Sequence, residues 1–534
     1  MSGGNDVRRW NGWGAEAVSH ALPPTAVEAL QAAVGAGTPP EDAGLAQVLA
    51  TVPRSRLPAN ALVNIEPEAR LRHARGQSFP DLIALRSGRL PAFPDGVAFP
   101  ECTEEVRALL AYARRVGARL IPYGGGTSVV GHVNVEPDAA PVLTVSLERL
   151  QRLCVLSDED RLATFEAGVT GPRLEAQLRA RGYTLGHFPQ SFEHSTLGGW
   201  IATRSRGQQA LGYGRIESAF AGGRLESPVG SLVLPPLPSS STGPDVRELV
   251  LGSEGRVGLL TEATVRITPL PERESFHALF FPDWERARTA VRELAQSALP
   301  LSMLRLSTPQ ETAINLALAG HPRAVGFLRR VLSLRGAGEG RCMLVLGVSG
   351  TRRLAGLALK DALSLAARHG AVRVPVLGDK WRKGRFRAPY LRNAAWEAGW
   401  GVDTVETATT WSQVPTVLAA VEGALQTALA HEGERVLAFT HLSHVYASGS
   451  NLYTTFVFRL GASPEHTHAR WAALKAAASQ AMVAHGATIS HQHGVGTDHK
   501  PYLEAEKGAL GVQSIRNVLR TFDPDGLLNP GKLV

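Results

Sequence analysis

The feature that most constrains the fold is a helix followed at once by a strand and a glycine loop. Residues 103–117 carry acidic residues in the first turn, apolar residues spaced along one face, and a final glycine. This pattern predicts a helix with Thr103 as its N-cap and Gly117 as its stop. Residues 119–123, RLIPY, then predict a short buried strand.

The loop after this strand, GGGTSVVGH at 124–132, predicts an anion site. Three glycines let the backbone approach a ligand closely, and the hydroxyls of Thr127 and Ser128 add donors to a row of N–H groups, which suits a pyrophosphate. No lysine follows as in a Walker A loop, and the helix precedes the strand, unlike the nicotinamide fingerprint. Taken alone, the three glycines are equally compatible with a tight turn.

Length and composition indicate a large globular chain. Its 534 residues predict two to four domains, and 44% hydrophobic with 19% charged residues exclude a disordered chain. No stretch has the roughly 18 apolar residues of a spanning helix, and the N-terminus lacks an apolar signal region, so we expect a cytoplasmic protein. Three scattered cysteines argue against a disulfide framework, and the net charge of +8 comes without a nucleic-acid motif.

The order of expected elements divides the chain into four parts. Residues 1–90 carry broken helical periodicity and predict an N-terminal helical extension. Residues 91–271 predict a compact α+β unit of short strands. In 272–486, strands and helices alternate, which predicts a mixed sheet with helices on one face. Residues 487–534 form a C-terminal segment.

Two segments remain ambiguous from the residues alone. The stretch 379–392 has six Lys or Arg residues and fits a solvated loop, a surface for phosphates or a contact with an anionic membrane. The stretch 489–500, ISHQHGVGTDHK, contains four histidines, which can shuttle protons, bind a metal or lie solvated at the surface.

Several blocks in a fixed order give the chain a family resemblance. They are WNGWG at 10–14, IPYGGGTSVVG at 121–131, EAGVTGPRLEAQL at 166–178, TLGHFPQSFEHSTLGGWIATRS at 184–205, TGPD at 242–245, LGSEGRVGLLTEATVRI at 251–267, ETATTW at 406–411, SHQHGVG at 490–496 and DPDGLLNPGKL at 523–533. In these blocks the chain resembles the vanillyl-alcohol oxidase superfamily and, within it, the alkyldihydroxyacetonephosphate synthases. The resemblance implies an α+β fold: a PCMH-type FAD-binding domain at 91–271 and a substrate (cap) domain at 272–486. The histidine loop would return to the FAD-binding domain.

The resemblance also implies which residues bind FAD. Covalent members attach the flavin through a histidine at the position of Thr127, so the FAD should be non-covalent here. The implied cofactor-binding residues are Pro122, Tyr123, Gly124, Gly125, Gly126, Thr127, Ser128, Gln190, Ser191, Phe192, Glu193, His194, Ser195, Thr196, Thr203, Arg204, Ser205, Arg206, Gly252, Ser253, Glu254, Gly255, Arg256, Val257 and Gly258.

The activity implied by the resemblance is an exchange without net oxidation. The synthases replace the acyl group of acyl-dihydroxyacetone phosphate with a long-chain alcohol in ether-lipid synthesis, through an adduct at flavin N5. His491 and His493 are the implied proton-transfer groups, Tyr453 the acid/base residue and Arg392 a further active-site residue. A histidine is well suited to this work because its pKa lies near the working pH.

One departure leaves an alternative open. The arginine that binds substrate in the synthases corresponds to His441 here, and a neutral histidine binds phosphate poorly. FAD-linked D-2-hydroxy-acid dehydrogenases or oxidases place a histidine in a similar segment. In their metal-dependent members two histidines and a glutamate bind the ion. His441 corresponds to one of these histidines, but Tyr453 and Gln492 stand in place of the other two ligands, so we expect no metal site.

A third interpretation is a catalytically degenerate flavoprotein that serves as a binding module, although His491, His493 and Tyr453 are all present. We expect a small-molecule or lipid substrate, no nucleic-acid partner and a homodimer. A fatty-chain substrate would favour peripheral membrane contact, for which an amphipathic N-terminal helix could serve.

Overall fold

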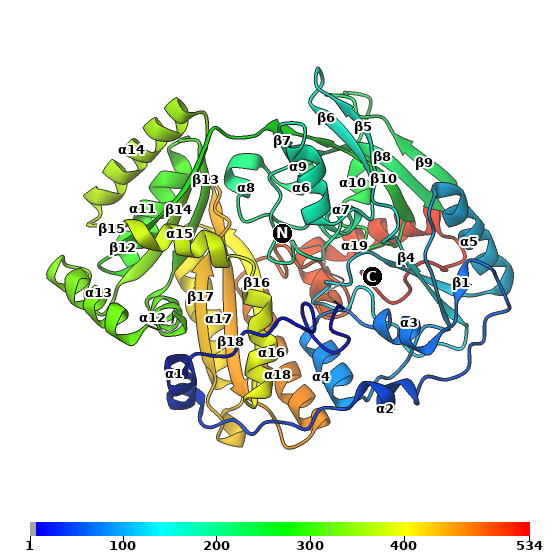
Figure 1. Cartoon of the computed structure of the whole chain (residues 1–534), viewed down its shortest axis with the longest axis horizontal. Coiled ribbons are helices and arrows are strands. Elements are labelled where there is room, and N and C mark those ends of the chain that lie inside the picture. Colours follow the sequence, from blue (N-terminus) through cyan, green and yellow to red (C-terminus); the bar gives the residue numbers. More distant parts are fainter. Residues whose placement is uncertain (1–6, 320) are drawn as a thin grey trace.

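The computed structural model describes residues 7–319 and 321–534. Two lobes lie side by side, and the N-terminal stretch runs along the lower edge of both (Figure 1). Residues 1–6 of the predicted N-terminal extension lie outside the described residues. The predicted boundary between residues 271 and 272 falls in the link between the last short strand of the first lobe and the first strand of the second.

The first lobe contains two main sheets. Their strands are β1 (Val63–Asn64), β2 (Gly96–Ala98), β3 (Arg119–Tyr123), β4 (Val142–Ser146), β5 (Leu153–Ser157), β6 (Leu162–Glu166), β8 (Phe220–Ser227), β9 (Gly230–Leu234) and β10 (Leu259–Arg266). The first sheet has the order β1-β2-β4-β3, with β2 and β3 parallel to β4. The second is antiparallel, in the order β5-β6-β10-β8-β9. The strands β7 (Tyr183–Thr184) and β11 (Thr268–Pro269) form a separate short antiparallel ladder.

The helices of the first lobe include α5 (Thr103–Val116), which follows the pattern predicted for 103–117, and several short helices that the sequence did not predict. The other helices of this lobe are α3 (Pro67–Arg72), α6 (Gly171–Arg179), α7 (Leu197–Thr203), α8 (Ala210–Tyr213), α9 (Ile216–Ala219) and α10 (Arg247–Val250). Helix α4 (Phe79–Ser87) instead packs Phe79, Leu82 and Ile83 into the apolar core of the second lobe. Gly117 ends α5 in the left-handed conformation as predicted. The predicted N-cap is wrong: Cys102 is the cap, its side chain makes no capping bond, and Thr103 is the first helical residue. Within the predicted unit of short strands at 91–271, residues 247–250 form the helix α10.

The second lobe is built on one seven-stranded sheet. Its strands are β12 (Arg273–Phe281), β13 (Leu301–Ser307), β14 (Cys342–Gly350), β15 (Val372–Val374), β16 (Trp400–Thr410), β17 (Leu437–Leu442) and β18 (Gly449–Arg459). They lie in the order β15-β12-β14-β13-β17-β18-β16. All of the recorded pairings are antiparallel, so the predicted mixed sheet is wrong. Helical crossovers place β13 two positions from β12, and β14 enters between them, as in a split βαβ unit.

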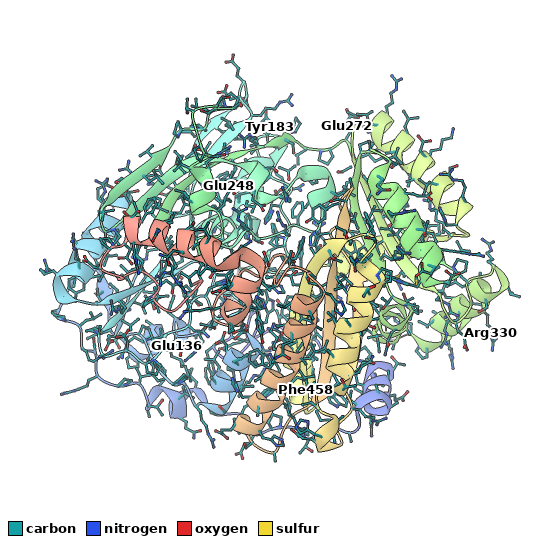
Figure 2. The ribbon with its side chains drawn as sticks, turned by 180° about the vertical axis from the view of Figure 1, so that it is seen from behind. Glu136, Tyr183, Glu248, Glu272, Arg330 and Phe458 are labelled. Atoms are coloured by element: carbon teal, nitrogen blue, oxygen red, sulfur yellow. The ribbon has the colours of Figure 1, made fainter. Side chains whose placement is uncertain are left out.

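Helices cover both faces of this sheet. They are α11 (Trp284–Gln296), α12 (Pro309–Leu318), α13 (Pro322–Leu334), α14 (Arg352–Arg368), α15 (Pro375–Gly384), η1 (Ala388–Tyr390), α16 (Leu391–Glu397), α17 (Val414–Thr427), η2 (Ala430–Glu432) and α18 (Pro464–Ala484). The long helices α11, α14, α17 and α18 pack on one face over the largest apolar core, and α17 and α18 run side by side (Figure 2). The prediction of helices on one face is incomplete, because α12, α13 and α15 contact the other.

The two ends of the chain tie the lobes together. Helix α1 (Pro24–Val34) packs on the second sheet through Leu30 and Val34, whereas β1 pairs with β2 in the first lobe. Helix α2 (Leu45–Leu49) lies between them along the chain. At the other end, η3 (Lys500–Tyr502) and α19 (Leu503–Phe522) lead to Leu528, which bridges to Leu120 of β3. The N-terminal segment therefore spans both lobes.

Candidate active site

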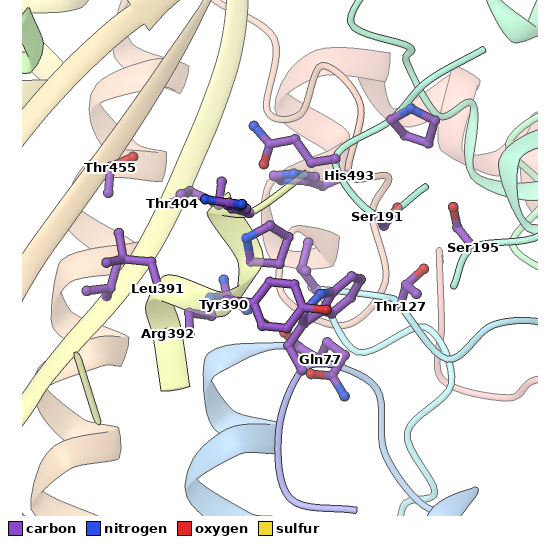
Figure 3. Close-up of a pocket in the computed structure, with 18 of the residues that line it drawn as sticks. Gln77, Thr127, Ser191, Ser195, Tyr390, Leu391, Arg392, Thr404, Thr455 and His493 are labelled. Atoms are coloured by element: carbon purple, nitrogen blue, oxygen red, sulfur yellow. Dashed lines mark hydrogen bonds between the residues drawn. The ribbon is translucent and has the colours of Figure 1, made fainter. Parts of the chain in front are cut away.

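A cavity of about 890 Å³ lies between the two lobes. Its wall combines segments that are far apart in sequence (Figure 3). Gln77 and Thr127 come from the first lobe, Arg392 and Thr404 from the second, and His493 from the C-terminal loop. Such a volume lies in the upper part of the range of roughly 300–1,000 Å³ typical of ligand sites.

The glycine loop forms part of this wall directly after β3. A side chain at Gly125 would overlap the carbonyl oxygen of His194, and one at Gly126 would overlap the Tyr123 hydroxyl. Gly126 also has φ of +62°, a conformation that favours glycine. The loop is therefore packed against the 190–196 segment in a way that only glycine permits.

Twelve of the predicted FAD-binding residues line the cavity. They are Gly124, Gly125, Gly126, Thr127, Ser128, Gln190, Ser191, Ser195, Thr196, Thr203, Ser205 and Arg206. The histidine of the loop, His132, is hydrogen-bonded at Nδ1 to Ser128 Oγ at 2.9 Å, and its Nε2 atom lies 3.1 Å from Glu254 Oε1 without forming a hydrogen bond in the described chain.

The other predicted FAD-binding residues support the wall from behind. Phe192 stacks on Phe386 at 5.1 Å between ring centroids, and Arg204 pairs with Glu248 at 2.5 Å. Glu193 accepts a hydrogen bond from the Tyr390 hydroxyl at 3.2 Å. The remaining supporting residues are Pro122, Tyr123, His194 and the segment 252–258.

Within the 252–258 segment, Glu254 holds the C-terminal histidine loop in place. Its buried carboxylate accepts hydrogen bonds from the N–H groups of Val495 at 2.6 Å and Gly496 at 2.9 Å. Its backbone carbonyl accepts another from Asn529 Nδ2 at 2.8 Å. This segment therefore fixes the position of the loop relative to the first lobe.

A second buried carboxylate, Glu406 of β16, holds the loop from the other lobe. It accepts hydrogen bonds from the N–H groups of Gln492 at 2.5 Å and His493 at 2.8 Å. Burial alone would raise the pKa of Glu406, but His493, His491 and these N–H donors together bring it well below its ordinary value. Glu406 is thus an anion at neutral pH, a role that we did not predict although its segment belongs to the block at 406–411 that carries the family resemblance.

The two predicted histidines of the loop have different surroundings. His493 lines the cavity, and burial lowers its pKa despite the nearby charge of Glu406, so its ring is neutral at pH 7. His491 lies deeper, where its Nε2 atom is 2.6 Å from the Tyr446 hydroxyl. Only His493 of this pair is among the residues that line the cavity.

Tyr453 of β18 faces His493 across the wall, with 5.9 Å between ring centroids. Burial raises the pKa of Tyr453 to about 12, so the phenol keeps its proton at neutral pH. The hydroxyl lies 3.3 Å from Thr404 Oγ1 and 3.5 Å from Gln190 Oε1. The cavity therefore holds one proton donor and one proton acceptor close together.

Arg392 lines the cavity as predicted, but its charge is already balanced. Its guanidinium donates to the carbonyl of Gln77 and pairs with Asp403. Gln77 belongs to the first lobe, so this contact also joins the lobes. Arg392 is placed to shape the wall and orient a ligand.

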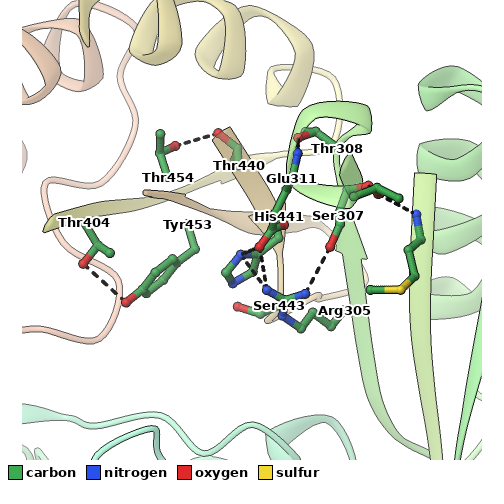
Figure 4. Close-up of polar contacts among 12 residues, drawn as sticks. Arg305, Ser307, Thr308, Glu311, Thr404, Thr440, His441, Ser443, Tyr453 and Thr454 are labelled. Carbon is green, nitrogen blue, oxygen red and sulfur yellow. Dashed lines mark hydrogen bonds and ion pairs between the residues drawn. The ribbon is translucent and has the colours of Figure 1, made fainter. Parts of the chain in front are cut away.

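His441 of β17 belongs to a group of three polar side chains (Figure 4). Its Nδ1 atom is 2.9 Å from Glu311 Oε1 and 3.1 Å from Arg305 Nη2, and Arg305 pairs with Glu311 at 2.6 Å. Burial lowers the pKa of His441, whereas Arg305 and His441 bring the pKa of Glu311 to about 2 against the effect of burial. In the part of the chain that the structure describes, no group of three or more His, Cys, Asp or Glu side chains is placed to hold a metal ion.

Comparison with known proteins matches this architecture. A profile of the FAD binding domain matches residues 94–233, and one of the C-terminal domain of FAD linked oxidases matches residues 270–533. Alkyldihydroxyacetonephosphate synthase of Trypanosoma brucei brucei is 30% identical over 482 residues, which are 88% of this chain and 78% of that protein. The chain belongs to the alkyldihydroxyacetonephosphate synthase family.

Two further comparisons show the fold of this synthase-family chain and a more distant relative. A solved alkyldihydroxyacetonephosphate synthase structure superposes with a TM-score of 0.84 over 98% of this chain and 99% of that one, at 24% identity. The cytochrome D-lactate dehydrogenase of Arabidopsis thaliana is more distant, at 25% identity over 83% of this chain and 73% of that protein. FAD is the cofactor, and the fold is the predicted α+β arrangement of an FAD-binding domain and a cap domain.

The backbone and side-chain groups that line the cavity are suited to binding FAD. The glycine loop offers a backbone surface that approaches closely, with the hydroxyls of Thr127 and Ser128 beside it. Next to His493, Gln492 presents a buried side-chain oxygen that has no hydrogen-bond partner among residues 7–319 and 321–534. A buried acceptor of this kind can accept a hydrogen bond from an N–H or O–H group of a bound molecule.

Proposed function

We propose that this protein replaces the acyl group of acyl-dihydroxyacetone phosphate with a long-chain alcohol. In this exchange the substrate carbon loses its bond to the acyl oxygen, which leaves with the fatty acid. The alcohol oxygen forms the new ether bond and gives up its proton. The similarity to the synthases supports this reaction, and the protonation states in the cavity carry the structural argument.

The observation that carries the proposal is the pairing of a protonated Tyr453 with a neutral His493 on one cavity wall. An incoming alcohol needs a base to take its proton, which His493 supplies. The departing acyl oxygen needs a hydrogen-bond donor, which Tyr453 supplies. Bound FAD would contribute a ring that can hold and return an electron pair during the exchange.

The chain's own residues would hold the cofactor without a covalent bond. The glycine loop and the 190–196 segment would carry the pyrophosphate, with Thr127 where a covalent member has histidine. His132 is the histidine of this loop, and it lies in the protein interior, with Nδ1 hydrogen-bonded to Ser128 and Nε2 close to the buried Glu254 carboxylate. We therefore expect FAD to dissociate on denaturation.

An apolar part of the cavity suits the fatty chains. Leu22, Leu391, Val402 and Phe439 belong to one apolar cluster between the N-terminal segment and the second sheet, and all four line the cavity. Each buried methylene of a chain contributes about 0.8 kcal/mol. Chain length in both substrates should therefore influence affinity strongly.

Anaerobic flavin spectroscopy tests the reaction. Acyl-dihydroxyacetone phosphate should decrease the flavin absorbance and release one fatty acid per enzyme, and hexadecanol should restore the absorbance as the ether product appears. A parallel cuvette with D-lactate and glycolate should show no change. Lasting flavin reduction by a hydroxy acid, without response to the ester, would instead establish a dehydrogenase.

We infer that the protein reaches its lipid substrates through peripheral membrane contact. None of the described helices combines the length and apolarity needed to span a bilayer. The apolar side of α1 is packed on the second sheet, but α13 exposes 71% of Phe327 and 88% of Leu334 beside several arginines. One of these, Arg330, lies at the outer edge of the molecule (Figure 2). Basic and apolar side chains on one helix suit an anionic lipid surface.

Vesicle sedimentation tests this contact. The protein should bind phosphatidylglycerol vesicles more strongly than phosphatidylcholine vesicles, and Phe327→Ser should weaken both. Leu510→Ser is the matched control, because Leu510 is 81% exposed on α19. Equal sedimentation of the two variants would remove α13 from the contact.

We also propose that the protein is a homodimer. Leu354 and Leu357 lie one turn apart on α14 and are both half exposed, which gives a small apolar face for a second copy. Sedimentation equilibrium should give twice the mass of 56.9 kDa. A monomer at all micromolar concentrations would refute the proposal.

A further inference from the structure

A second chamber of about 400 Å³ adjoins the main cavity. The two share several wall residues, among them Gln190, Arg305, His441 and Gln492. His441 stacks on Tyr453, and Gln492 precedes His493, so the second chamber opens beside the proton donor and acceptor. A ligand in the main cavity could place one end in this chamber.

The walls of this chamber carry four cationic side chains, namely Arg206, Arg305, Lys380 and Arg385. Two of them are neutralised within the protein. Arg206 pairs with Glu217 at 2.5 Å, and Arg305 pairs with Glu311 at 2.6 Å. The other two determine the net charge of the chamber.

Arg385 is held in place by neutral groups. Its Nη1 atom donates to Gln209 Oε1 at 2.8 Å, and its guanidinium carbon lies 4.6 Å and 4.8 Å from the ring centroids of Phe188 and Phe386. Within residues 7–319 and 321–534, no carboxylate lies within 4.0 Å of this guanidinium, and burial lowers its pKa. Arg385 is therefore a half-buried cation without an ion-pair partner within 4.0 Å in the described chain, and a bound anion would stabilise it.

Lys380 adds a second cation without a carboxylate partner in the described chain. It lies exposed on α15, the helix that occupies the first part of the predicted basic stretch at 379–392. The interpretation of this stretch as a solvated loop is wrong for α15 and for Arg385. The stretch supplies one wall of the chamber.

We propose that this chamber binds the phosphate group of the substrate, with Arg385 as the main anion ligand and Lys380 as the second. The inference rests on the proposed function, since it assigns the phosphate end of that substrate. A guanidinium fixed by stacking and one hydrogen bond keeps its other N–H groups available for two oxygens of a phosphate. The chain would then lie along Leu22, Leu391, Val402 and Phe439 in the main cavity, with the reacting carbon between the two ends.

This assignment also accounts for His441. His441 belongs to the wall that the main cavity and the second chamber share, and Arg305 lies 3.1 Å from its imidazole. An arginine in place of His441 would therefore lie beside Arg305. Because Glu311 neutralises Arg305, that pair adds no net charge. The free positive charge is instead on α15.

Calorimetric titration of the FAD-loaded full chain tests the site without turnover. The probes are dihydroxyacetone phosphate, inorganic phosphate and dihydroxyacetone. Arg385→Gln should weaken dihydroxyacetone phosphate about 10- to 100-fold, the effect of one lost charged hydrogen-bond pair. It should weaken inorganic phosphate similarly and leave dihydroxyacetone unchanged.

Arg382→Gln is the matched control, because Arg382 lies on the exposed side of α15 and is not part of the chamber wall. Lys380→Gln gives a second measurement if Arg385→Gln does not fold, and it should weaken dihydroxyacetone phosphate several-fold. Equal affinities of wild type and both variants for the phosphate compounds would overturn the assignment. Chain exchange that persists with unchanged KM in Arg385→Gln would overturn it too, while leaving the proposed function intact.

Discussion

Replacing Glu406 by glutamine tests whether a buried charge holds the histidine loop in its working position. The carboxylate accepts the N–H groups of Gln492 and His493 and lies 3.5 Å from His493 Nδ1. Glutamine has the same shape and can keep an oxygen toward both N–H donors, which share the Oε1 atom, but it is neutral. The change therefore removes the charge and leaves the volume of the site unaltered.

The expected cost follows from the two hydrogen bonds. A hydrogen bond to a charged group contributes about 1.5–3 kcal/mol, and one between neutral groups about 0.5–1.5 kcal/mol. Weakening both bonds lowers the stabilisation of the loop in its working position by about 2–3 kcal/mol. If the reaction requires that position, kcat/KM should fall about 30- to 150-fold.

The assay is kcat/KM for fatty-acid release, with FAD content measured on the same samples. Glu422→Gln is the control, since Glu422 is a largely buried carboxylate that accepts from Thr440 at 2.6 Å away from the loop. Wild-type kcat/KM in Glu406→Gln at full FAD content would refute the role of the charge.

The pH dependence of the rate distinguishes the role of Glu406, which holds the histidine loop, from proton transfer by His493. Because the pKa of Glu406 is lowered on folding, its stabilising effect is complete above the ordinary glutamate pKa and is lost only as the pH falls through the folded value. Between pH 5 and 8 the anchor is therefore constant. Changes of rate in this range should follow His493, whose neutral form is favoured by burial.

Three further results are expected. His493→Ala should retain FAD and lose turnover, with His485→Ala, an exposed residue at the end of α18, as a control that keeps both. Tyr453→Phe should lower kcat about 10²- to 10⁴-fold with little change in FAD content, as loss of an acid catalyst does, and restored activity at high pH would contradict its role as donor. Acid precipitation should release FAD into the supernatant, because Thr127 replaces the histidine that attaches the flavin in covalent members. Flavin that stays with the pellet would disprove non-covalent binding.

Local patterns in the sequence predicted what depends on neighbouring residues. The helix at 103–116, the strand at 119–123 and the glycine loop follow from capping, periodicity and glycine content within about thirty positions. The details that failed depend on other parts of the chain. Strand pairing in the second sheet is set by helical crossovers, and periodicity does not reveal which strand enters between two others.

The site shows the same division. The residues that line the cavity at 124–128 and 190–196 lie in blocks that could be read from the sequence. Arg305 could not, because it meets His441 across 136 positions and its strand carried no polar motif. Arg385 lies in the basic stretch at 379–392, for which a phosphate surface was one interpretation, but no local pattern distinguished it from the other basic residues there. Its position depends on two phenylalanines, one of them nearly 200 positions away.

The opposite protonation states of Tyr453 and His493 favour exchange over oxidation. A dehydrogenase removes a proton and a hydride from one substrate, so a base beside the flavin is sufficient and a protonated phenol has no step to perform. An exchange has two half-reactions, one in which an oxygen departs and one in which an alcohol loses its proton, and it needs both a donor and an acceptor. Burial produces this pair from ordinary side chains, because it raises the pKa of the tyrosine to about 12 and lowers that of the histidine.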